Sequence, residues 1–189
     1  MITQERPTKI ARWPVVRVQA GERVEVQFLS SDFVRLVTHF HRTTFLCPEV
    51  EECDACSLLP GRAYWYLPVQ HVQYKGYGLL ELSAHACSDL EQKCRFAGAA
   101  LRPGVQVELS RRSQKKPLGI EFNGQAPNPP LARLEEWVSP LMALYGLPPI
   151  RPGESLDAYG DRVKPAAIAR ANLRAAAYKL DPKPWAKAR

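Results

Sequence analysis

Three cysteines and two histidines lie within eighteen residues of this chain, in types and at spacings that suit metal binding. The segment begins at Thr38-His39-Phe40-His41, continues through Cys47 and ends at Cys53-Asp54-Ala55-Cys56. Three thiolates and one imidazole form a complete tetrahedral set for Zn²⁺. Two cysteines separated by two residues can reach one ion from a single turn, so the other two ligands must come from the segment before it.

Only one of the two histidines is expected to be a ligand. If residues 33–45 form a strand, His39 and His41 point to the same face, and we favour His39. The other imidazole is then left to the same pocket, to nucleic acid, or to the acidic residues of the knuckle. Four protein ligands close the coordination sphere, which favours a structural ion over a catalytic one. Cys87 and Cys94 lie two turns apart on an expected helix and are interpreted as small buried side chains.

A second group of residues suits contact with an unpaired nucleic-acid strand. Aromatic rings stack on bases and cations hold phosphates, and stacking is worth roughly 1–3 kcal/mol per base. Because one face of each strand must enter the core, we expect at most half of the rings to meet a ligand. The candidate nucleic-acid-binding residues are Arg62, Tyr64, Tyr66, Tyr74, Lys75, Tyr77, Arg111, Arg112, Lys115 and Lys116.

The net charge of +7 is unevenly distributed along the 189 residues. Residues 162–189 contain eight Lys or Arg and one Asp, so the whole basic excess lies in this C-terminal segment. A basic tail is typical of polyanion binding, although a solvated helix gives the same composition. The chain contains no Walker loop, nucleophile elbow, zinc-protease motif or deaminase motif, and we therefore expect a non-enzymatic protein.

The sequence also indicates where in the cell the protein is located. There is no run of eighteen uncharged apolar residues, which argues against a membrane span, and the first residues contain no apolar stretch typical of a secretory signal. We therefore expect a cytoplasmic protein. Five cysteines clustered with histidine fit metal ligation better than a disulfide framework.

The patterns of apolar residues and of turn residues predict a series of short strands with a few helices. The expected strands are 14–19 and 23–30 (a hairpin around Gly21), 33–45, 61–74 with Pro68 at an edge or bulge, 79–82, 105–109 and 118–122, and residues 47–57 form a knuckle loop. The expected helices are 84–96 behind an N-cap at Ser83, 131–145 interrupted near Pro140, and 156–180 broken at Pro165.

These elements predict a mainly β fold: a small Greek-key barrel of the OB-fold type, with an inserted zinc knuckle, one helix within the barrel and a helical C-terminal extension. Other small barrels with a metal ribbon have nearly the same elements. We divide the chain into a flexible arm (1–13), the OB-like zinc-containing nucleic-acid-binding domain (14–124), a Pro-rich spacer (125–130) and a helical, basic C-terminal extension (131–189).

One family shares several of these motifs. The run His39-Phe40, Cys47-Pro48, Cys53 to Cys56, Arg62 and Tyr64 to Val69 resembles the zinc-containing OB-fold single-stranded DNA-binding proteins of phages. The resemblance covers about residues 34–75. The spacer between the first cysteine and the cysteine pair is shorter here, and the tail is basic where the T-even phage member has an acidic one. The resemblance implies a basic cleft lined by aromatic rings, and it implies zinc ligands at His39, Cys47, Cys53 and Cys56.

We therefore expect a single-stranded DNA-binding protein with a structural zinc, acting in replication, recombination or mobile-element processes. One alternative is an adaptor whose residues 131–189 recruit a replication, recombination or transposition protein. Another alternative is an RNA-binding zinc module.

Overall fold

The computed structural model describes residues 13–51, 53–113 and 115–180. Residues 1–12 of the expected arm, residues 181–189 of the basic tail and residues 52 and 114 lie outside this part. Within the described residues, the chain order is β1 (Val15–Val16), β2 (Arg23–Phe28), β3 (Val34–His41), β4 (Thr43–Leu46), α1 (Asp54–Leu58), β5 (Arg62–His71), β6 (Tyr77–Ser83), α2 (Ala84–Phe96), β7 (Val105–Ser110), β8 (Gly119–Gln125), α3 (Leu134–Ala143) and α4 (Leu156–Leu180).

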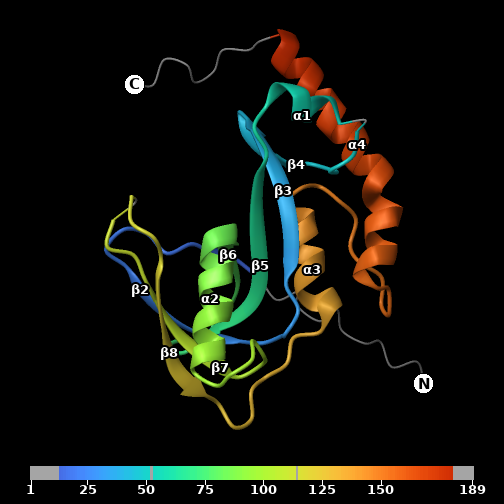
Figure 1. Ribbon diagram of the computed structural model, residues 1–189. Helices are drawn as coiled ribbons and strands as arrows, with labels where there is room; N and C mark the ends of the chain where they lie inside the picture. Colours follow the sequence, from blue (N-terminus) through green and yellow to red (C-terminus); the bar gives the residue numbers. More distant parts are fainter. Residues whose placement is uncertain (1–12, 52, 114, 181–189) are drawn as a thin grey trace, which may run out of the picture.

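One eight-stranded sheet is built around β5, its longest strand (Figure 1). β6 pairs along one edge of β5, while β3 and β2 share the other edge, β3 along the first half and β2 along the second. The path through the sheet is β1-β6-β5-β2-β7-β8, and β4 pairs with β3. The expectation of a mainly β fold is confirmed.

The sheet does not close into the barrel that the sequence predicts. Among the described residues β8 pairs with β7 alone, and β1 occupies the free edge of β6 in a parallel pairing. That edge is the one that β8 would need for closure. Residues 14–19 were expected to form a hairpin with 23–30, but Val15 pairs instead with Leu79. Alternation of apolar residues identifies a strand but does not identify its partner.

Pro68 was expected at an edge or a bulge, because proline has no backbone N–H to donate. It lies instead inside the central strand β5. The partner strand changes at this point, because Val34 pairs with Tyr66 while Phe28 pairs with Val69. The Pro68 carbonyl accepts a hydrogen bond of 3.0 Å from the backbone N–H of Leu29, in the segment between β2 and β3. The ladder is already interrupted on this side of β5, so the proline removes no regular strand hydrogen bond.

The single strand expected over residues 33–45 is a hairpin. β3 and β4 fold back at Arg42, which has a left-handed backbone conformation with φ of 59°, and His41 pairs with Thr43. Left-handed φ is rare for residues other than glycine, and no turn dipeptide marks this position. The prediction of one uninterrupted strand was wrong for this reason.

The two faces of the sheet are covered by different helices (Figure 1). α2 packs on one face, with Leu90, Cys87 and Cys94 in a core that includes Phe28 and Leu67. Both cysteines are buried there, which confirms their interpretation. The other face is covered by α3 and α4, whose buried Trp137 and Tyr159 belong to one cluster with residues of β3, β5 and β6. The segment expected as an extension therefore contributes to the second core of the protein.

α2 begins and ends as predicted, and the Ser83 hydroxyl accepts a hydrogen bond of 3.3 Å from the N–H of Ala86. α3 is shorter than expected and contains Pro140, and α4 runs through Pro165 without a break. Pro165 is exposed, so water can reach the carbonyl one turn earlier that loses its helical partner.

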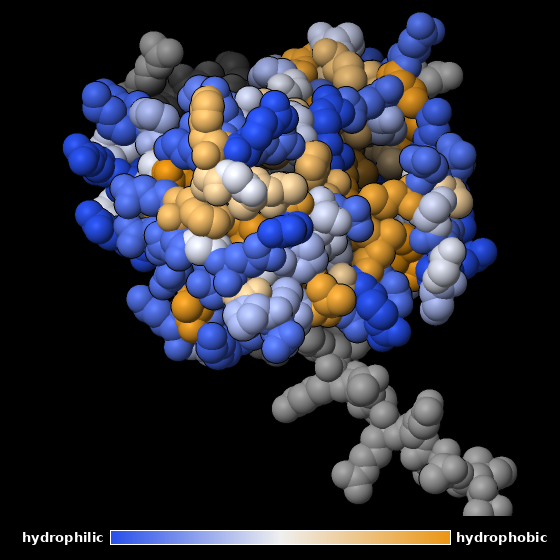
Figure 2. Space-filling model, turned by 60° about the horizontal axis from the view of Figure 1, so that its bottom comes forward, coloured by the Kyte–Doolittle hydropathy of each residue, from blue (hydrophilic) through white to orange (hydrophobic). Residues whose placement is uncertain are grey.

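Most of the surface seen in Figure 2 is hydrophilic, and its hydrophobic side chains gather in separate patches. Within the described part of the chain, no helix combines the length and the apolar character needed to cross a membrane.

Candidate metal centre and the groove beside it

His39, Cys47, Cys53 and Cys56 converge from three elements. His39 lies near the end of β3, Cys47 directly follows β4, Cys53 is the N-cap of α1, and Cys56 lies within α1. One ligand atom from each residue lies within 4.8 Å of all the others. The residues that the sequence singled out are therefore close enough to bind one metal ion.

The distances in this cluster suit a tetrahedral ion. Zinc–sulfur and zinc–nitrogen bonds of about 2.3 and 2.0–2.1 Å place tetrahedral ligand atoms roughly 3.5–3.8 Å apart. Here the Sγ atoms of Cys47 and Cys56 are 3.3 Å apart, and Cys56 Sγ lies 3.5 Å from His39 Nε2. The sulfur–nitrogen distance matches the tetrahedral value of about 3.5 Å, and the sulfur–sulfur distance is about 0.5 Å shorter than the tetrahedral value of about 3.8 Å. The donor set of three sulfurs and one nitrogen is one that zinc accepts.

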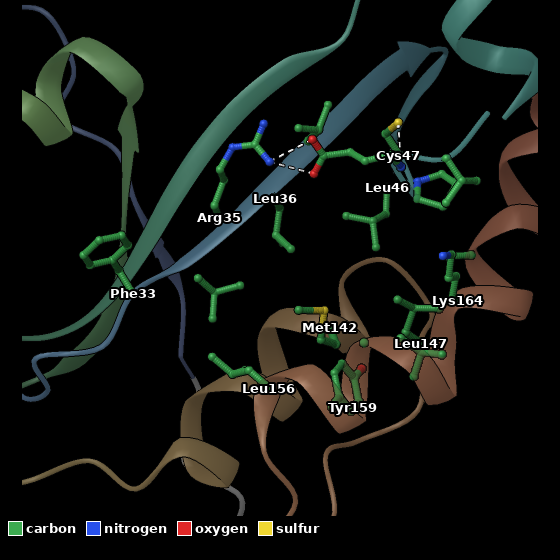
Figure 3. A pocket seen from close by; sticks show the side chains of 18 residues that line it. Phe33, Arg35, Leu36, Leu46, Cys47, Met142, Leu147, Leu156, Tyr159 and Lys164 are labelled. Atoms are coloured by element: carbon green, nitrogen blue, oxygen red, sulfur yellow. Dashed lines mark hydrogen bonds and ion pairs between the residues drawn. The ribbon is translucent and has the colours of Figure 1, made fainter.

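The backbone around the cysteines is shaped for such a site. Glu49 has φ of 53°, and its N–H donates a hydrogen bond of 3.3 Å to Cys47 Sγ. The Glu49 carboxylate is held by Arg35 through contacts of 2.7 and 2.8 Å (Figure 3). Cys56 N–H bonds to the Cys53 carbonyl at 3.0 Å, which forms the first turn of α1. Part of the knuckle, which was expected to be a loop throughout, is therefore helical.

Burial affects the thiols in this cluster. It raises the pKa of Cys47 to about 12, because the charged form loses its hydration, and it raises the pKa of Cys56 for the same reason. A divalent cation reverses this preference, since it stabilises the thiolate directly.

The structure separates the two histidines. His39 directs Nε2 to the cysteines, whereas His41 contacts Tyr178 of α4 edge to face, with ring centroids 5.3 Å apart. Both side chains are buried, and neither nitrogen of His41 has a hydrogen-bond partner among the described residues. His39, which the sequence analysis favoured as the ligand, is the histidine that lies with the three cysteines.

The C-terminal helix covers the cluster, which the sequence did not predict. Cys47 and Cys53 belong to a small buried group with Ala171 and Ala175 of α4. The Asn172 side-chain oxygen accepts a hydrogen bond of 3.0 Å from the N–H of Asp54, the first residue of α1. Small residues at every fourth position of α4 are the signal for such close packing, but they do not identify the partner.

A groove with a volume of about 650 Å³ lies beside the cluster; we call it the sheet groove. Its wall includes the candidates Arg62 and Tyr64, together with His39, Phe40 and Arg17. Sequence reasoning did not select Phe40 or Arg17. Alternation along the strand could have predicted Phe40, because its side chain must point to the face opposite His39 and His41. In the structure Phe40 is 50% exposed, whereas both histidines are buried.

The floor of the sheet groove is an internally satisfied polar network. Arg17 binds Glu81 through two hydrogen bonds of 2.6 and 2.8 Å. The Tyr66 hydroxyl donates to Glu81 at 2.8 Å and lies 3.1 Å from the Tyr145 hydroxyl. The Glu81 carboxylate raises the pKa of Arg17, and burial raises the pKa of Tyr66. Tyr66 is only 1% exposed, so it cannot stack on a base in this structure, and we remove it from the candidate interface.

The remaining candidates lie at three other places. Arg111 lines a depression that shares Arg17, Tyr64 and Glu81 with the sheet groove and is therefore continuous with it. Arg112, Lys115 and Lys116 are exposed in the loop between β7 and β8. Tyr74, Lys75 and Tyr77 lie at the turn between β5 and β6, where Tyr74 stacks on His71 and Tyr77 stacks on Trp13.

Comparisons of the chain with protein-family models, with curated proteins and with solved structures find no match. The function is therefore argued from the geometry of the cluster and of the sheet groove.

Proposed function

We propose that this chain is a non-enzymatic single-stranded DNA-binding protein in which one structural Zn²⁺ holds the knuckle. His39, Cys47, Cys53 and Cys56 would be the four ligands. Four protein ligands leave no open coordination position, so the ion would contribute folding free energy rather than catalysis. A role in replication, recombination or a mobile-element process fits this binding chemistry.

The observation that carries the proposal is the position of Phe40 and Tyr64 beside the metal cluster. Both rings line the same groove as His39 and Arg62. An ion bound by His39 would fix the strand on which Phe40 lies, and a fixed, partly exposed ring stacks on a base at low entropic cost. Arg62 has no carboxylate partner among the described residues and is exposed, so it can meet a phosphate.

The sheet supports an OB-type interpretation. β2, β5, β6, β7 and β8 are consecutive in the pairing order, and α2 lies between β6 and β7 in the chain. A five-stranded, partly open Greek-key sheet is the arrangement of the OB domains that bind single strands. In this interpretation β3, β4 and α1 form the inserted metal knuckle.

Binding of an oligo(dT) strand tests the proposal. We expect the purified protein to bind it, with an affinity that falls as salt rises, because the strand releases counterions from its phosphates. Phe40→Ala and Tyr64→Ala should each weaken binding roughly 5- to 150-fold, the loss expected for one stacked base.

Phe96→Ala is the matched control, because Phe96 is an exposed ring on α2, outside the sheet groove. It should leave the affinity unchanged. Absence of binding by the unmodified protein at low salt contradicts the proposal. Tighter binding of the matching oligo(U) strand would instead favour the RNA alternative.

A further inference from the structure

The sheet groove continues past the β3–β4 hairpin onto α4. A second depression, with a volume of about 700 Å³, shares Thr44, Leu144 and Tyr145 with the sheet groove. Its other wall is the exposed side of α4. We call this second depression the helix groove. The two grooves therefore adjoin one another, one beside the central sheet and the other beside α4.

The helix groove has a positive lining. Arg170 and Arg174 lie on its α4 wall, one helical turn apart, or about 6 Å along the axis. Its described lining contains no carboxylate, and neither guanidinium has an acidic partner among the described residues. Arg170 lies against the loop after α3: a Cβ atom on Gly146 would be 2.6 Å from Arg170 Nη1, so glycine leaves room for the guanidinium there.

Apolar side chains are exposed beside these cations. Leu144 is 58% exposed and Leu173 is 72% exposed, and both line the helix groove. An alternation of cations and exposed apolar surface suits a strand whose phosphates and base faces must both find partners.

We propose that the helix groove is a second segment of the nucleic-acid interface, in which Arg170 and Arg174 bind phosphates of the strand after it leaves the sheet groove. This inference rests on the proposed function of the sheet groove. Because Thr44, Leu144 and Tyr145 line both grooves, one strand can occupy both. The metal knuckle positions α4 through Ala171, Ala175 and Asn172, so the same structure fixes both segments.

The double variant Arg170→Gln/Arg174→Gln tests this inference. Each phosphate contact contributes about −0.7 to the slope of log K against log salt for a single strand. Loss of two contacts should therefore make the slope of a long oligo(dT), of about 20 nucleotides, shallower by about 1.4. An oligo(dT) of about 8 nucleotides, within the span of one OB groove, should lose less affinity than the long one.

Arg95→Gln/Arg102→Gln is the matched control, because it removes the same charge from exposed sites outside both grooves. It should leave the slope within experimental error of the unmodified protein. Equal slopes for the α4 variant and the control overturn the helix-groove inference while leaving the proposed function intact. If the unmodified protein binds neither strand, both proposals fall. Circular dichroism of each variant separates lost contacts from lost folding.

Discussion

The core under α2 and the core of the metal knuckle differ in what holds them together. Among the residues that the structure describes, the α2 core contains eighteen buried side chains, including Phe28, Leu67 and Leu90. The knuckle core contains seven, of which three are alanines and two are cysteines. A fully buried Leu or Phe contributes about 1.5–3 kcal/mol, and alanine far less. Burial of apolar side chains therefore stabilises the first core much more than the second.

This difference explains why the potential ligands lie where they do. Cys47 and Cys53 occupy positions in the small core that large apolar side chains fill elsewhere in the protein. A metal ion at this point would replace missing apolar contact with ligand bonds. Each core can be disturbed separately, and we predict a different outcome for each.

Cys53→Ser should have the largest effect. Structural zinc binding contributes on the order of 10 kcal/mol, so loss of one ligand should release the ion and unfold the knuckle while the α2 core remains folded. Mass spectrometry of the native protein measures the ion, and hydrogen exchange should show faster exchange in α1 and β4 but not in α2.

Cys94→Ser is the matched control, since Cys94 is buried in the α2 core, and it should keep the ion. A metal-free but fully protected unmodified protein would refute the metal centre.

Leu90→Ala should destabilise the α2 core and leave the metal site intact. Leu90 is fully buried in the α2 core, and its truncation should cost about 2–5 kcal/mol of unfolding free energy, measured from the urea midpoint. The folded fraction should retain its metal-to-protein ratio. Loss of the ion in this variant would show that the two cores depend on each other, against the comparison drawn here.

Asn172→Ala should have the smallest effect. It removes the oxygen that accepts the Asp54 N–H, and loss of a helix cap costs about 0.5–2 kcal/mol. Exchange of the Asp54 amide should accelerate, and the ion should stay bound. Asn123→Ala is the control, because Asn123 is an exposed residue of β8 that donates a hydrogen bond to Glu25 of β2. It should change the stability by less than about 0.5 kcal/mol.

The local features of the molecule could be predicted from the sequence. α2 was found with its N-cap because Ser83 and the following periodicity act over a few residues. The proximity of His39 and the three cysteines was predicted because these residues are close in the chain. Such signals depend on near neighbours and survive in any fold that keeps them together.

Features that depend on distant partners could not be predicted. The pairing of Val15 with Leu79 depends on which edge of the sheet is free, and the reversal at Arg42 depends on contacts that overcome an unfavourable φ. Alternation could have predicted the exposed ring of Phe40. It could not have predicted the groove, because Leu144 and Tyr145 come from the turn after α3, which is remote in the chain.

The hydrogen bond between Asp54 and Asn172 spans 118 residues. A ribosome that adds about 5–20 residues per second makes Asn172 roughly 6–24 s after Asp54. The last of the four candidate ligands, Cys56, is added only two residues after Asp54. The growing polypeptide therefore contains all four candidate ligands for several seconds before the segment of α4 that packs over them is made.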